Sequence, residues 1–92
     1  MNIAIVDDEK IELEAAEVFL RAYIKKFWAD YESRIHIDIF YRVNEFLTFF
    51  SPKIYNLVIL GVHVKNIAQF IRTQGDNNVD ILFLDAYGED FV

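Results

Sequence analysis

Three short apolar runs constrain the fold of this chain more than any other feature. They occupy residues 3–6, 57–62 and 79–84, and almost every side chain in them is apolar. Such runs are too short for core helices and are typical of strands that are buried on both faces of a parallel sheet. We therefore expect parallel strands, which need long crossover connections between them.

The segments between these runs have the periodicity of helices. From Glu9 onward, polar and apolar side chains recur on opposite sides of a predicted long amphipathic helix. The polar stripe is Lys10, Glu14, Glu17, Arg21 and Lys25, and the apolar stripe is Leu13, Ala16, Leu20, Tyr23, Ile24 and Phe27. A second helix is expected over residues 45–50 with Asn44 as its N-cap, and a third is expected around Ile67, Phe70 and Ile71.

A further strand is predicted over residues 35–41, where apolar and polar side chains alternate. Alternation indicates one more exposed face, hence a place near the sheet edge. Strands and helices thus alternate along the chain, which predicts an α/β fold with helices on both faces of a parallel sheet. Ligands of such sheets bind at the carboxyl ends of the strands. Asp7, Asp8, Gly61 and Asp85 are expected at those ends.

Composition narrows the possible partners. The net charge of -6 disfavours a nucleic-acid backbone as a partner, so we expect no direct nucleic-acid binding. The chain has no cysteine, and the apolar run before Asp7 is too short for a signal peptide. No stretch approaches the ~20 apolar residues of a membrane span, and a cytoplasmic protein without membrane contact is expected. His36 and His63 are too far apart to suggest zinc.

The residues at the strand ends resemble those of receiver (CheY-like) domains of two-component response regulators. Residues 5–9, Ile-Val-Asp-Asp-Glu, are similar to the acidic pair that binds magnesium in that family. Residues 55–60, Tyr-Asn-Leu-Val-Ile-Leu, are similar to the lead-in to the phosphate-accepting aspartate, whose position is taken by Gly61. The long first helix looks most like receivers of LytTR-type regulators. The resemblance covers residues 1–92 as one domain.

This resemblance implies a flavodoxin-like, three-layer fold with strand order 2-1-3-4 and without the family's fourth helix, fifth strand and fifth helix. It also implies lost chemistry. Gly61 removes the nucleophile, Asp85 stands where a threonine or serine normally binds the phosphoryl group, and the family's lysine lies beyond Val92. The short segment between Gly61 and Arg72 predicts a short or displaced third helix.

Two readings of the acidic residues stay open. A divalent cation such as Mg²⁺ could be held by Asp7 and Asp8, joined by Asp85 and the His63 carbonyl, because hard cations prefer oxygen ligands. Alternatively, the acids at positions 7–9 cap the first helix. Asp85 follows an apolar run and is an alternative phosphoacceptor. A set of aromatics is expected in the core: Phe19, Phe27, Trp28, Phe46, Phe49 and Phe50.

The expected function is that of a receiver module without enzymatic activity, acting through protein–protein interaction rather than phosphotransfer. The predicted partner is a second copy, paired along the exposed edge of the strand at residues 79–84, or another response regulator. A sensor histidine kinase is a further candidate. The alternative is a fragment of a phosphorylatable regulator that controls transcription through a missing DNA-binding domain.

Overall fold

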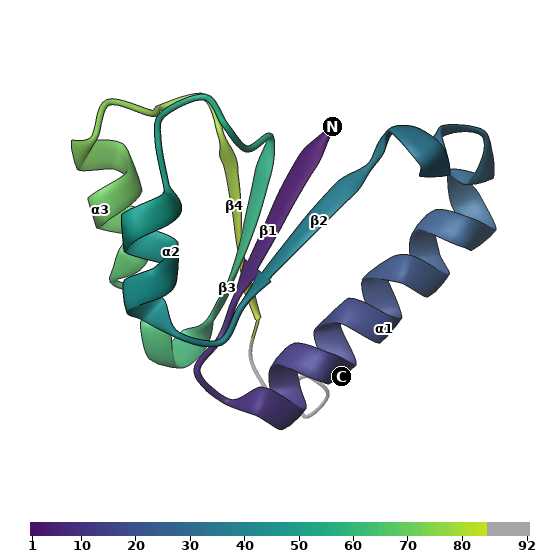
Figure 1. Cartoon of the computed structure of the whole chain (residues 1–92), viewed down its shortest axis with the longest axis horizontal. Helices are drawn as coiled ribbons and strands as arrows, with labels where there is room; N and C mark the ends of the chain where they lie inside the picture. Colours follow the sequence, from purple (N-terminus) through teal and green to yellow (C-terminus); the bar gives the residue numbers. More distant parts are fainter. Residues whose placement is uncertain (85–92) are drawn as a thin grey trace.

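The computed structural model describes residues 1–84, and four parallel strands form its centre (Figure 1). The strands are β1 (Asn2–Val6), β2 (His36–Phe40), β3 (Leu57–Gly61) and β4 (Asp80–Leu84). Their order in the sheet is β2-β1-β3-β4. The apolar runs therefore form strands as predicted, and the strand order implied by the resemblance is confirmed.

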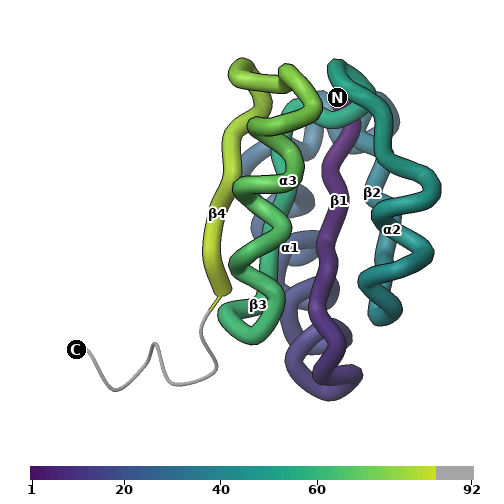
Figure 2. Tube along the Cα trace, turned by 90° about the vertical axis from the view of Figure 1, so that its left-hand side faces the viewer, coloured from purple at the N-terminus to yellow at the C-terminus, as the bar shows by residue number. Residues whose placement is uncertain are grey.

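Helices cover both faces of this sheet. α1 (Lys10–Phe27) lies on one face, and α2 (Val43–Phe49) and α3 (Ile67–Thr73) lie side by side on the other (Figures 1 and 2). Two 3-10 turns complete the connections, η1 (Ala29–Arg34) and η2 (Val62–Val64). The predicted α/β architecture of three layers is thus present.

The two faces of the sheet have separate cores because successive side chains of a strand point to opposite faces. Phe46 is the largest fully buried side chain and packs with alternate strand residues under α2 and α3. The opposite core, under α1, is smaller and consists of Ile3, Ile5, Leu13, Ala16 and Ile59. One helix therefore covers a face of four strands, while two helices cover the other.

The start of α2 differs from the prediction. Arg42 precedes the helix without any side-chain cap, and Asn44 lies inside the first turn. The Asn44 carbonyl accepts a hydrogen bond from the Thr48 hydroxyl at 2.9 Å, so its backbone is already helical. Asn44 is therefore not the N-cap, because burying Phe46 between α2 and the sheet starts the helix two residues earlier than the local polar signal suggests.

Two side chains of the predicted apolar stripe on α1 are exposed, although the stripe was expected to face the core. Leu13, Ala16 and Ile24 are buried as expected. Tyr23 is 44% exposed and Phe27 is 59% exposed. The core on this face is small, and neither Tyr23 nor Phe27 is among the side chains that pack against it.

Candidate functional site

The carboxyl ends of β1 and β3 form the candidate site, and Asp7 is its centre. Asp7 follows β1 directly and is fully buried, and its backbone N–H donates to the Phe40 carbonyl of β2 at 3.0 Å. Its Oδ1 accepts the backbone N–H of Glu9 at 2.9 Å. The side chain is thereby turned back over the sheet rather than out to solvent.

Gly61 lies directly beside this carboxylate. A Cβ atom added at Gly61 would come within 2.5 Å of the Asp7 Cγ atom and within 2.6 and 2.7 Å of its two carboxylate oxygens. Gly61 has an ordinary extended backbone, with φ -61° and ψ 149°, so its conformation does not require glycine. Glycine is required instead by the close approach of Asp7. This strand end therefore carries no side chain at Gly61, and the Asp7 carboxylate takes up the space beside it.

Glu12 is a site residue that sequence reasoning missed. Its carboxyl group lies near Asp7 in the first turn of α1, and burial, followed by the charge of Asp7, raises the pKa of Glu12. Oε2 of Glu12 and Oδ2 of Asp7 are buried without a hydrogen-bond donor in the described part of the chain. Burial and the neighbouring charge of Asp7 therefore both disfavour the charged form of Glu12.

A signal for Glu12 exists in the sequence. Glu12 lies four residues before Ala16 and so shares a side of the helix with a core residue. A glutamate at that position must meet the end of a neighbouring strand. The predicted polar stripe contains five charged residues of α1, and Glu12 lies outside it.

The other residues predicted for a metal site are Asp8, His63 and Asp85. Asp8 and His63 are exposed, and Asp85 lies outside the described residues. Among residues 1–84 no group of three or more histidine, aspartate or glutamate side chains is placed to hold a metal. Magnesium is usually held by one or two carboxylates, with water completing its octahedron, and Asp7 and Asp8 are adjacent carboxylates at this strand end. The magnesium site stays a prediction.

The capping interpretation receives a specific form. Glu9 is the N-cap of α1 and makes no side-chain cap hydrogen bond. Asp7 accepts a hydrogen bond from the Glu9 N–H, so it stabilises the turn that leads into the helix. This contact lies just before the helix, whereas a capping side chain would bond to an N–H group of the first helical turn. The acids therefore shape the entry to α1 through Asp7.

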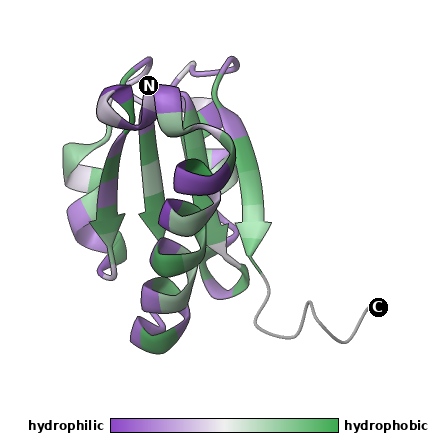
Figure 3. Cartoon of the chain, turned by 90° about the vertical axis from the view of Figure 1, so that its right-hand side faces the viewer, coloured by the Kyte–Doolittle hydropathy of each residue, from purple (hydrophilic) through white to green (hydrophobic). Residues whose placement is uncertain are grey.

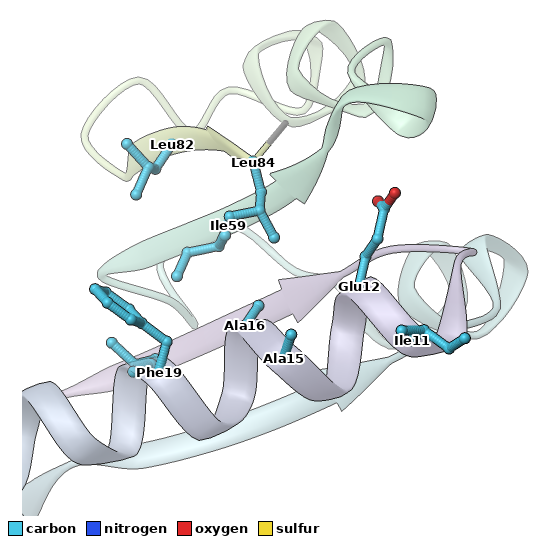
Figure 4. Close-up of a pocket in the computed structure, with 9 residues that line it drawn as sticks. Ile11, Glu12, Ala15, Ala16, Phe19, Ile59, Leu82 and Leu84 are labelled. Carbon is cyan, nitrogen blue, oxygen red and sulfur yellow. The ribbon is translucent and has the colours of Figure 1, made fainter. Parts of the chain in front are cut away.

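An apolar groove adjoins this site on the α1 face of the sheet. It has a volume of about 400 Å³ and lies between α1 and the strands β3 and β4 (Figure 4). Its lining is Ile11, Glu12, Ala15, Ala16, Phe19, Leu20, Ile59, Leu82 and Leu84. Seen from the α1 side, β4 stands beside the helix with an apolar surface and no helix of the described chain above it (Figure 3).

The aromatic residues expected in the core divide into two groups. Phe46 and Phe50 are buried and pack together, with ring centroids 5.5 Å apart. The other four are exposed, which corrects the prediction for them: Phe19 by 72%, Phe27 by 59%, Trp28 by 41% and Phe49 by 52%. Phe46 and Phe50 belong to the deep core that two helices enclose, whereas Phe49 lies on the same side of the sheet but is half exposed.

Two polar clusters away from the site hold the fold together. Buried Asp76 accepts the backbone N–H groups of Lys53, Asn78 and Val79, which ties the connection before β3 to the one before β4. On the edge strand β2, Asp38 accepts the Tyr55 hydroxyl at 2.7 Å and contacts His36 at 2.9 Å. Neither cluster opens into the groove.

No helix within residues 1–84 combines the length and apolar character that crossing a membrane requires. Comparison of the chain with models of known protein families, with curated proteins and with solved structures found no match. The observations that bear on function are therefore the small parallel α/β sheet, the carboxylates at its carboxyl edge and the apolar groove beside them.

Proposed function

We propose that this chain is a receiver-like signalling module that accepts no phosphoryl group and acts by binding other proteins. The observation that carries the proposal is the packing of the Asp7 carboxylate against Gly61. Phosphoryl transfer to a receiver needs a carboxylate nucleophile at this strand end and donors around the phosphoryl oxygens. Gly61 supplies no nucleophile, and the space beside it is occupied by the Asp7 carboxylate, which repels phosphate.

The strand order supports the receiver-like part of the proposal. An acidic residue at the end of β1, with β3 beside it, is the arrangement that the family resemblance implies. The apolar groove and the exposed edge of β4 support the binding part, because contiguous exposed apolar surface on a soluble domain marks interaction sites. A second copy, another response regulator and a sensor histidine kinase are the partners this proposal includes.

The test is incubation of the chain with a small phosphodonor and Mg²⁺, followed by intact-mass measurement. We expect no phosphoryl adduct on the unmodified chain. We also expect no normal phosphorylation of Gly61→Asp, because Asp7 stands in the path of the new side chain. A hydroxylamine-sensitive adduct on the unmodified chain, at Asp85 or elsewhere, would overturn the proposal.

Magnesium binding is measured separately by calorimetric titration. Because Asp7 is enclosed by Gly61 and Glu12, we expect little heat from the unmodified chain. Heat that disappears in Asp8→Asn would instead establish the predicted site at Asp7 and Asp8. The result of the phosphodonor experiment does not depend on whether magnesium binds, because a cation alone supplies no nucleophile.

A further inference from the structure

The apolar surface of α1 is much wider than its own sheet can cover. At about 100° per residue, the apolar side chains of α1 extend over about 240° of its circumference, from Val18 round to Ile24. Lys10, Glu14, Glu17, Arg21 and Lys25 occupy the remaining narrow arc, and two charged residues, Glu12 and Lys26, lie within the apolar arc. Only Leu13, Ala16 and Ile24 are buried.

The uncovered part of this arc lies toward the groove. Ile11 is 82% exposed, Phe19 is 72% exposed and Val18 is 69% exposed, and Ile11 and Phe19 line the groove with Ala15 between them (Figure 4). These residues recur three and four positions apart, as on a helix that packs against another helix. A helix is about 10 Å wide, and neighbouring strands are about 4.8 Å apart. One helix therefore leaves room for a second over β3 and β4.

The geometry points to α1 of a second copy of this chain as the helix that covers the groove, packed antiparallel to the first α1 about a twofold axis. Large and small residues alternate along the groove side in an order that complements itself under this symmetry. Phe19 then lies over Ala15 of the second copy, and Ala15 lies under the second copy's Phe19. The same register sets Ile11 beside Tyr23 of the second copy.

Charge favours the same orientation. The approach to α1 is acidic at Asp8 and Glu9, and its last turn is basic at Lys25 and Lys26. An antiparallel pair in this register brings Asp8 near Lys26 of the second copy, twice by symmetry. The helix dipoles are also opposed, which is favourable for neighbouring helices.

The available area suits a dimer. Ile11, Val18, Phe19, Tyr23 and Leu82 are each exposed by 44% or more. At roughly 100 Å² each, they supply roughly 500 Å² of apolar surface per copy, and a standard specific interface buries roughly 800 Å² per partner. The alanines and the charged flanks between these side chains supply the remainder.

This inference names a partner for the proposed binding function and does not depend on how the chain responds to phosphodonors. It also differs from pairing along β4, which uses backbone groups and leaves Phe19 uninvolved. A dimer held by α1 and a dimer held by β4 therefore respond differently to changes on α1.

The first experiment is sedimentation equilibrium of the full chain over a range of concentrations. We expect a monomer–dimer equilibrium that Phe19→Glu weakens by about thirtyfold or more, as for a central interface residue. Phe49→Glu is the matched control, since Phe49 is also exposed, by 52%, but lies on α2 across the sheet. Circular dichroism checks that both variants fold. A monomer at every concentration, or equal effects of the two substitutions, would overturn the inference.

The second experiment tests the register through a charge exchange. Asp8→Lys alone and Lys26→Asp alone each place like charges together at both ends of the pair, so each should weaken dimerisation roughly threefold to tenfold. An equimolar mixture restores both attractions, and it should form mixed dimers at the affinity of the unmodified chain in low salt. A mixture no tighter than the separate variants refutes the antiparallel register.

Discussion

Gly61→Ala tests the central contact of the candidate site. The new Cβ would lie 2.5 to 2.7 Å from three atoms of the Asp7 carboxyl group, so Asp7 must move. Overpacking of a buried site costs about 1–3 kcal/mol, and losing the hydrogen bond from the Glu9 N–H costs about 1.5–3 kcal/mol more because the acceptor is charged. Partial relaxation of Asp7 lowers the sum, and we expect a loss of about 2–4 kcal/mol.

The assay is urea unfolding of a double-mutant cycle with Asp7→Ala. If the cost of Gly61→Ala is a clash with the Asp7 side chain, that cost should nearly vanish when Asp7 is already alanine. The coupling free energy should then be about 2 kcal/mol or more, at the upper end of the range for contacting residues. Additive effects within about 0.5 kcal/mol would refute the packing explanation.

Gly75→Ala is the control for a purely conformational effect. Gly75 has a φ of 91° and no atom within 4 Å of an added Cβ, so alanine there is strained without a clash. The expected loss is about 1–2 kcal/mol, and it should be the same with and without Asp7→Ala. Dependence on Asp7 at this distant position would show that the cycle measures something other than local packing.

Three further predictions concern stability, measured by urea unfolding across pH. Glu12→Gln should stabilise the protein by about 0.5–1 kcal/mol at neutral pH, because the amide donates to Asp7 without a second charge. Since the pKa of Glu12 is raised, this gain in stability appears as pH rises above the ordinary glutamate range and is absent below that range. An equal gain at acidic pH would contradict the argument. Asp76→Ala should cost about 2–3 kcal/mol at pH 7, since three backbone N–H groups lose their acceptor. The hydrogen bond from the Lys53 N–H, the largest influence, lowers the pKa of Asp76, so this cost should shrink only as pH falls below the ordinary aspartate range, and a pH-independent cost would argue against a charged acceptor. Phe46→Ala should cost about 3–5 kcal/mol by opening a cavity in the core, and a loss below about 1 kcal/mol would mean that α2 does not depend on this side chain.

The strands and long helix could be predicted because their signals are local. Residues 3–6 and 57–60 are apolar without interruption, and a buried parallel strand needs nothing else. The start of α2 could not be predicted, because the polar signal of Asn44 competes with the burial of Phe46, which only the packed sheet reveals. Tertiary burial decides such cases over capping preference.

The candidate site was only partly predictable. The pattern of acids identified Asp7, and strand order placed it beside Gly61, yet the contact between them depends on the side-chain direction set by the Glu9 N–H. A search for acidic residues at strand ends could not identify Glu12, because Glu12 belongs to a helix. The exposure of Phe19 likewise depends on which strands lie under α1. The sequence shows how wide the apolar side of the helix is, but it does not show how much of that side the sheet covers.

The two edges of the sheet within residues 1–84 differ in a way that limits assembly. β2 carries His36 and Asp38, with Asp38 held toward Tyr55, and a charged edge strand resists pairing with another strand. β4 carries one charged residue, Asp80, at its start, and its other four residues, Ile81, Leu82, Phe83 and Leu84, are apolar. A chain that associates only on its β4 side, about a twofold axis, forms a closed dimer, because each copy then uses its one attractive side for a single neighbour. Open-ended growth into filaments needs two attractive sides, and the β2 side is not one of them.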